Sequence, residues 1–214
     1  KDVAAEFING RPNDNIGITL FAGETFTQCP LTVDHAVLLD MIHNIKCGLI
    51  TDGTAVGMGI ANAVTRLKDS KAKSKVIILL TDGTNNKGDI SPMTAAEIAK
   101  SFGIRVYTIG VGTNGMAPYP YPVGNTVQYV SMPVEIDEKT LTEIAGTTDG
   151  NYFRATSNSK LKEVYEEIDK LEKTKLNVKE YSKRDEEYHW FALAAFLCVL
   201  LEVLLRNSVL KKIP

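Results

Sequence analysis

The chain has 214 residues, of which 44% are hydrophobic and 23% charged, with 24 basic and 26 acidic side chains. This composition is sufficient for one packed domain with an appendage and excludes a wholly disordered chain. The near balance of charge gives no electrostatic basis for binding nucleic acid. The spacing of the cysteines matches no zinc site or CxxC motif. The sequence does not decide whether Cys29 and Cys47 form a disulfide, which would require an oxidising compartment.

The first part of the chain alternates between helical and extended patterns. Residues 1–8 (KDVAAEFI) have the pattern of the middle or end of an amphipathic helix without an N-cap, so we expect the chain to begin inside a larger protein. Four elements are then predicted in order: strands over 16–21 and 26–29, a helix capped by Asp34 that runs to His43, and, after a loop over 48–53, a helix over 56–68.

The clearest strand is 76–81 (VIILLT), which is apolar throughout, as expected of a central parallel strand buried on both faces. A polar loop follows over 82–92. Residues 112–124 are rich in Gly, Pro and Tyr, which predicts an irregular, polyproline-like loop and an exposed surface for a partner. The remaining elements are predicted to be helices over 94–102, 137–145 and 159–173, and strands over 104–111 and 151–154. This alternation predicts an α/β fold with a doubly wound, mostly parallel sheet.

The chain ends in an apolar segment. Residues 190–201 (WFALAAFLCVLL) are uninterrupted, and the pattern extends over 188–210. A helix of that length covers about 34 Å, enough to cross a bilayer; a buried C-terminal helix is the alternative. We therefore predict a domain over 1–173, a linker over 174–187 and a transmembrane helix over 188–210. Residues 170–187 are compatible with an extended strand, a linker or a continuing helix, and the basic residues flanking the apolar segment do not predict its orientation.

Two polar motifs are predicted to lie close together at one end of the sheet, where their side chains could bind a ligand. Residues 51–57 (TDGTAVG) form a loop that opens onto a helix, and residues 79–86 (LLTDGTNN) contain the end of the buried strand with its Asp. In parallel α/β sheets ligands bind beyond the carboxyl ends of the strands, and a carboxylate with a hydroxyl suits a hard cation such as Mg²⁺. We therefore predict Thr54 and Asp82 as metal ligands, with one position left for a partner's carboxylate. Alternatively, Thr54 is a helix N-cap and Asp82-Gly83 a turn.

These motifs, in this order, resemble the von Willebrand factor A domain. Longer stretches resemble the Bat aerotolerance-type membrane proteins of bacteria: FAGETFTQCPLT, DGTAVGMGIANAVTRLKDS and KSKVIILLTDGTNNKGDISP. The resemblance implies a metal-ion-dependent adhesion site that includes Thr54 and Asp82. It also implies further N-terminal membrane spans and a domain that faces the periplasm from the bacterial inner membrane. The implied partners are sister A-domain and TPR-containing membrane proteins and a MoxR-type AAA+ ATPase.

One part of the family pattern is absent. The DxSxS motif, whose Asp and two Ser are direct ligands in the family, would lie before Lys1. We therefore expect the sheet to lack its first strand, and this chain to bind Mg²⁺ weakly or not at all while the full-length parent binds it.

The leading functional interpretation is a binding module without catalytic activity, because the sequence offers no evident nucleophile or general base. His35, His43 and His189 share no spacing with acidic residues. Two alternatives stay open: a metal-dependent hydrolase or phosphatase using Asp82 and Asp52, and a structural membrane scaffold with a vestigial metal site.

Overall fold

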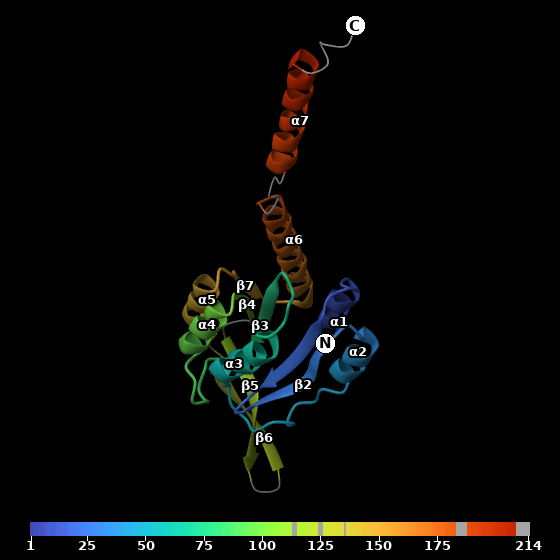
Figure 1. Ribbon diagram of the computed structural model, residues 1–214. Coiled ribbons are helices and arrows are strands. Elements are labelled where there is room, and N and C mark those ends of the chain that lie inside the picture. Colours follow the sequence, from blue (N-terminus) through green and yellow to red (C-terminus); the bar gives the residue numbers. More distant parts are fainter. Residues whose placement is uncertain (113–114, 124–125, 135, 183–187, 209–214) are drawn as a thin grey trace. The chain divides into compact units, whose positions relative to one another are not determined.

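The computed structural model describes residues 1–112, 115–123, 126–134, 136–182 and 188–208. The chain forms two compact units, Lys1–Lys173 and Thr174–Pro214. Three parallel strands form a sheet in the first unit (Figure 1): β3 (Lys75–Thr81) pairs with β4 (Ile104–Val111), and β4 pairs with β7 (Tyr152–Ala155). A separate antiparallel ladder joins β1 (Ile16–Phe21) to β2 (Thr25–Thr32). The predicted α/β class and parallel sheet are confirmed, and β2 is longer than predicted.

The described helices that lie wholly or largely in this unit are α1 (Asp2–Asn9), α2 (His35–His43), α3 (Val56–Leu67), α4 (Pro92–Ser101), α5 (Glu138–Thr147) and α6 (Asn158–Ser182). Side-chain caps explain several of their starts. The predicted cap of α2 is confirmed, because the Asp34 carboxylate accepts a hydrogen bond from the Val37 amide at 3.2 Å. Helix α4 begins earlier than predicted because Ser91 caps it and Pro92 occupies the first turn.

The parallel sheet is buried on both faces. Along β4, Ile104 and Val106 pack into one apolar cluster, while Tyr107 and Ile109 pack into a second one. The first cluster contains residues of α3, α4 and α5, and the second contains residues of α6. Because neighbouring residues of a strand point to opposite faces, this division places helices on both sides of the sheet, which is the doubly wound arrangement.

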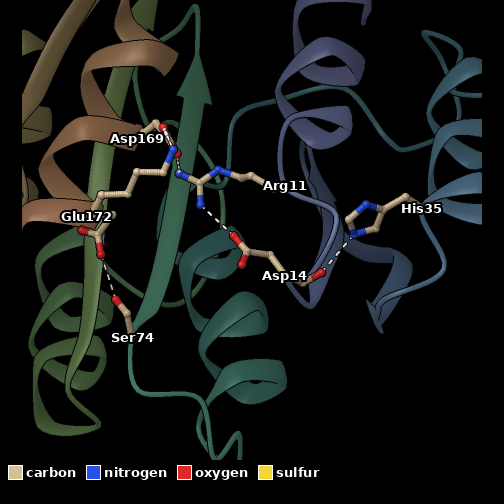
Figure 2. Close-up of polar contacts among 7 residues, drawn as sticks. Arg11, Asp14, His35, Ser74, Asp169 and Glu172 are labelled. Atoms are coloured by element: carbon tan, nitrogen blue, oxygen red, sulfur yellow. Dashed lines mark hydrogen bonds and ion pairs between the residues drawn. The ribbon is translucent and has the colours of Figure 1, made fainter. Parts of the chain in front are cut away.

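Polar contacts attach α6 to the rest of the unit (Figure 2). The Arg11 guanidinium, just after α1, lies between the carboxylates of Asp14 at 2.7 Å and Asp169 at 2.6 Å. One turn further along α6, the buried Glu172 carboxylate accepts a hydrogen bond from Ser74 at 2.8 Å, as Figure 2 shows. It accepts a second one from Tyr107 at 2.6 Å. Arg105 pairs with the same carboxylate.

The prediction of an irregular loop over 112–124 was wrong. Residues 115–123 form strand β5 (Gly115–Val123), which pairs with β6 (Thr126–Val134) in an antiparallel hairpin. Alternating prolines led to the polyproline interpretation. They are compatible with a two-stranded ladder because only every second residue of a strand donates its amide to the partner strand.

The C-terminal prediction also needs correction. Helix α6 runs through Ser182, so the first part of the charged stretch is a continuing helix. Helix α7 (Tyr188–Ser208) lies within the predicted 188–210 segment, whose last two residues are outside the described part. Among the described residues, no helix has the length and apolarity needed to cross a membrane, so the predicted transmembrane helix is not supported. Cys29, which is buried, and Cys47, which is exposed, are both free thiols.

Candidate functional site

The two predicted motifs occupy loops that lie against each other. One loop precedes α3 and contains Thr54, and the other follows β3 and contains Asp82. The Thr54 amide donates to the Asn86 side-chain oxygen at 2.8 Å, and the Asn86 amide donates back to the Thr54 carbonyl at 3.0 Å. The Lys87 amide reaches the same carbonyl at 3.3 Å. These bonds fix the Thr54 backbone to the loop that follows the central strand.

Asn85 contributes the cap of α3. Its side-chain oxygen accepts a hydrogen bond from the Val56 amide at 2.9 Å, while the N-cap position belongs to Ala55, whose side chain makes no cap bond. The alternative interpretation of Thr54 as the N-cap is therefore wrong. The cap comes from a loop about thirty residues away, which leaves the Thr54 hydroxyl available for another role.

The Thr54 hydroxyl lies beside the residue that follows Asp82. A Cβ atom at Gly83 would be 3.2 Å from Thr54 Oγ1, which is a tight contact. The glycine thus leaves room around the hydroxyl. Thr54 is half-buried and Asp82 is exposed. The structure therefore brings the two predicted ligand residues to neighbouring positions on one edge of the sheet.

Thr81, the last residue of β3, shapes the turn that carries Asp82. Its buried hydroxyl accepts a hydrogen bond from the Gly83 amide at 3.3 Å and donates to the Gly83 carbonyl at 3.2 Å. A hydroxyl bonded to its own local backbone holds a turn in one conformation. The interpretation of Asp82-Gly83 as part of a turn is compatible with its position next to Thr54.

A third segment borders the site. The turn between β1 and β2 contacts the 51–55 loop through two backbone bonds: the Gly23 amide donates to the Thr51 carbonyl at 2.8 Å, and the Ala55 amide donates to the Ala22 carbonyl at 2.7 Å. A Cβ at Gly23 would lie 2.6 Å from the Asp52 carbonyl oxygen, so the close approach requires glycine. Backbone bonding on two sides positions the Thr54 loop before any ligand binds.

The donor set suits a hard cation but is small. Thr54 and Asp82 offer a hydroxyl and a carboxylate, which are the oxygen ligands that Mg²⁺ accepts. In the part of the chain that the structure describes, no group of three or more His, Cys, Asp or Glu side chains is placed to hold a metal ion. The two residues fit part of a metal site, and further ligands must come from outside this pair.

The described histidines have local contacts. A ring nitrogen of His35 is 2.9 Å from the Asp14 carbonyl oxygen (Figure 2), and one of His43 is 2.7 Å from the Leu39 carbonyl oxygen in the preceding turn of α2. Neither contact involves the Thr54 and Asp82 loops. The side chain of His189 lies outside the described set.

Asn85 and Asn86 were not predicted as site residues. Their signal in the sequence is a pair of adjacent asparagines after the Asp-Gly-Thr that follows β3. Asparagine side chains favour local and capping bonds, but the helix that receives the Asn85 bond is far away in sequence. Pattern reasoning within one loop therefore misses it.

Comparison with known proteins identifies the fold. The model of the von Willebrand factor type A domain matches residues 1–167. The chain belongs to this family. A-domains are generally protein-interaction modules, and they commonly bind a metal ion at an adhesion site.

Two solved structures resemble this one. BatB from Bacteroides thetaiotaomicron has a TM-score of 0.69 and 32% identity, with 80% of this chain and 86% of that chain covered. An aerotolerance-related membrane protein from Bacteroides fragilis has a TM-score of 0.68 and 28% identity, covering 79% of this chain and 84% of that one. The resemblance to Bat-type proteins is thereby confirmed.

A relative from Borreliella burgdorferi, described only as an uncharacterized protein, is 26% identical over 214 residues. The match covers the whole of this chain and 63% of the relative's length. This chain therefore spans less than two thirds of the length of that relative.

Proposed function

We propose that this A domain is a membrane-associated interaction module that binds a partner protein through a Mg²⁺ ion held by Thr54 and Asp82. The observation that carries the proposal is the position of the half-buried Thr54 hydroxyl beside Gly83, directly after Asp82. The ion would draw its remaining ligands from the rest of the parent protein and from a carboxylate of the partner. Thr54 would orient one ligand oxygen, and Asp82 would supply negative charge to offset the cation.

The cellular setting is proposed from the Bat relatives. One solved relative is described as an aerotolerance-related membrane protein. We propose that this protein acts at the bacterial inner membrane, with the A domain (1–173) facing the periplasm and joined through 174–187 to the C-terminal segment. The proposed partners are sister A-domain and TPR-containing membrane proteins and a MoxR-type AAA+ ATPase.

Partner capture tests the metal-bridged contact. The full-length protein is used as bait for the proposed partners, with and without EDTA, and as the Asp82→Ala variant. We expect EDTA and Asp82→Ala each to abolish most of the capture. Asp89→Ala is the matched control, because Asp89 is an exposed carboxylate of the same loop and is expected to leave capture unchanged. Capture that is indifferent to both EDTA and Asp82→Ala would refute the metal bridge.

Thermal unfolding with added Mg²⁺ gives a readout that needs no partner. A ligand that binds only the folded state raises the free energy of unfolding by about 2.7 kcal/mol at a hundred times its dissociation constant. Mg²⁺ is expected to raise the midpoint of the full-length protein but not that of Asp82→Ala or Thr54→Val. Equal midpoints for all three proteins with and without Mg²⁺ would assign the loops a structural role only.

A further inference from the structure

The β5–β6 hairpin has two edges of different chemistry. The ladder pairs Pro118 with Ser131, Pro120 with Tyr129 and Pro122 with Val127, and a fourth proline, Pro133, pairs with Met116. Cross-strand pairs of a ladder alternate between two kinds, and all four prolines belong to pairs of the same kind.

That kind must be the one whose backbone groups point away from the opposite strand. In an antiparallel ladder, pairs that exchange hydrogen bonds alternate with pairs whose amides and carbonyls face outward. Proline has no amide hydrogen, so it is tolerated only at outward-facing positions. Residues 118, 120 and 122 of β5 then face outward, and so do residues 127, 129, 131 and 133 of β6.

The outer edge of β5 is consequently closed to a further strand. Three successive outward positions, at residues 118, 120 and 122, lack a donor. The outer edge of β6 differs, because Val127, Tyr129 and Ser131 all carry outward amide hydrogens and carbonyl oxygens. In the described part of the chain, β5 and β6 pair only with each other, so no third strand covers this edge.

From Val127 to Ser131 the open edge also lacks the usual protection against pairing, because its one outward proline, Pro133, lies beyond this stretch near the end of β6. Natural edge strands carry charges, prolines or bulges that discourage association. The sequence from Val111 to Val134 contains no Asp, Glu, Lys, Arg or His. Tyr129 is 72% exposed, Met116, on the same face of the hairpin, is 66% exposed, and Val130 on the other face is 47% exposed. An isolated two-stranded hairpin is marginally stable in water, and a further strand would stabilise it.

We infer that the outer edge of β6 pairs with β6 of a second copy of this chain, forming a four-stranded antiparallel sheet across a two-fold axis. An uncharged edge can meet its own copy without like-charge repulsion. Pairing centred on Tyr129 would set Val127 opposite Ser131, so that all three outward amides of each copy find acceptors. Because the β5 edges are closed, the association ends at two copies and does not propagate into a fibre. This contact uses neither Thr54 nor Asp82 and is independent of the proposed metal bridge.

The molar mass of the full chain in detergent solution, measured by light scattering over a concentration series, tests the inference. Wild type is expected to form two-copy particles. Ser131→Pro removes one outward amide per copy while sparing the bonds to β5, and should weaken the association about tenfold or more. Ser131→Ala keeps the amide and should retain it. EDTA should have no effect, which separates this test from that of the metal site.

A second variant controls for misfolding caused by the proline substitution. Tyr129→Lys keeps every backbone group but places like charges opposite each other at the two-fold axis, and should also dissociate the pair. Both variants should have the thermal midpoint that wild type shows once it is diluted to single copies, because the hairpin strands pair only with each other in the described structure. A wild-type chain that stays monomeric at all concentrations would overturn the inference. So would two-copy particles that survive both substitutions, because association through α7 would behave in that way.

Discussion

Glu172 is a charged side chain held inside the domain, with only 5% of its surface exposed. Burial disfavours its charged form, but hydrogen bonds from Tyr107, Ser74 and Arg105 outweigh burial and lower the pKa of its carboxyl. The same burial and bonding raise the pKa of the Tyr107 hydroxyl, which stays protonated and donates. The group therefore consists of a carboxylate with three donors, which links α6 to β4 and to Ser74, the residue before β3.

We predict that Glu172→Gln destabilises the domain and reduces its sensitivity to acid. Leaving Arg105 without its buried carboxylate should cost about 3 kcal/mol at neutral pH. In the unfolded chain Glu172 takes up a proton near its usual pKa of 4.5, whereas in the folded chain it does so only at lower pH. The unfolded state thus binds more protons as pH falls below about 5, and the free energy of unfolding decreases there.

Urea unfolding at pH 7 and pH 4 measures both effects. The decrease in unfolding free energy between the two pH values should be smaller in Glu172→Gln than in wild type. Glu163→Gln is the matched control, because Glu163 is exposed and pairs with Lys160 on the surface of the same helix. The same decrease in all three proteins would show that other carboxylates account for acid sensitivity.

At the scale of single elements, the start of α3 is set by Asn85 from a different loop. We predict that Asn85→Ala lowers the free energy of unfolding by about 1 kcal/mol, the usual cost of a lost N-cap. Asn85→Asp keeps an acceptor oxygen and adds a charge that the positive end of the helix stabilises, so it should be neutral or stabilising. Chemical unfolding of the three proteins checks this order. A loss in Asn85→Asp as large as that in Asn85→Ala would show that the amide group, and not its oxygen, is required.

Periodicity in the sequence predicts the elements whose signals are local. The boundaries of 16–21 and 104–111 match β1 and β4, and the Asp34 cap of α2 lies where its spacing places it. The hairpin was missed because prolines usually exclude strands, and their compatibility depends on which residue of β6 lies opposite. That register is a property of the pair and is not visible in either segment alone.

In the candidate site, too, the sequence predicts the residues with local signals and misses those whose role depends on distant segments. Thr54 and Asp82 were selected because they follow or precede strongly patterned elements. Their backbone environment depends on Asn86, Gly23 and Ala22, which come from other loops. The Glu172 group was not predicted either, since it joins residues up to 98 positions apart, from Ser74 to Glu172.

At the scale of the whole chain, the second unit differs from the first in what it exposes. Helix α7 presents large apolar side chains to solvent: Leu193, Phe196, Leu197, Val199, Val203 and Leu205. Exposed apolar surface of this extent marks a site of contact with a membrane or another protein. Under the proposed membrane association, this surface of α7 contacts lipid.

We predict that Phe196→Asp reduces binding of the full chain to liposomes of bacterial lipid about a hundredfold. Burial of a Phe side chain in the membrane surface contributes roughly 2–3 kcal/mol, which the substitution removes, and anionic lipid repels the added carboxylate. Phe26→Asp is the matched control, because Phe26 is exposed to a similar degree, 55% against 64%, but lies on β2 of the A domain. Co-sedimentation should show the loss only for Phe196→Asp. Equal binding by wild type and both variants would remove α7 from the membrane contact and leave its apolar surface for a protein partner.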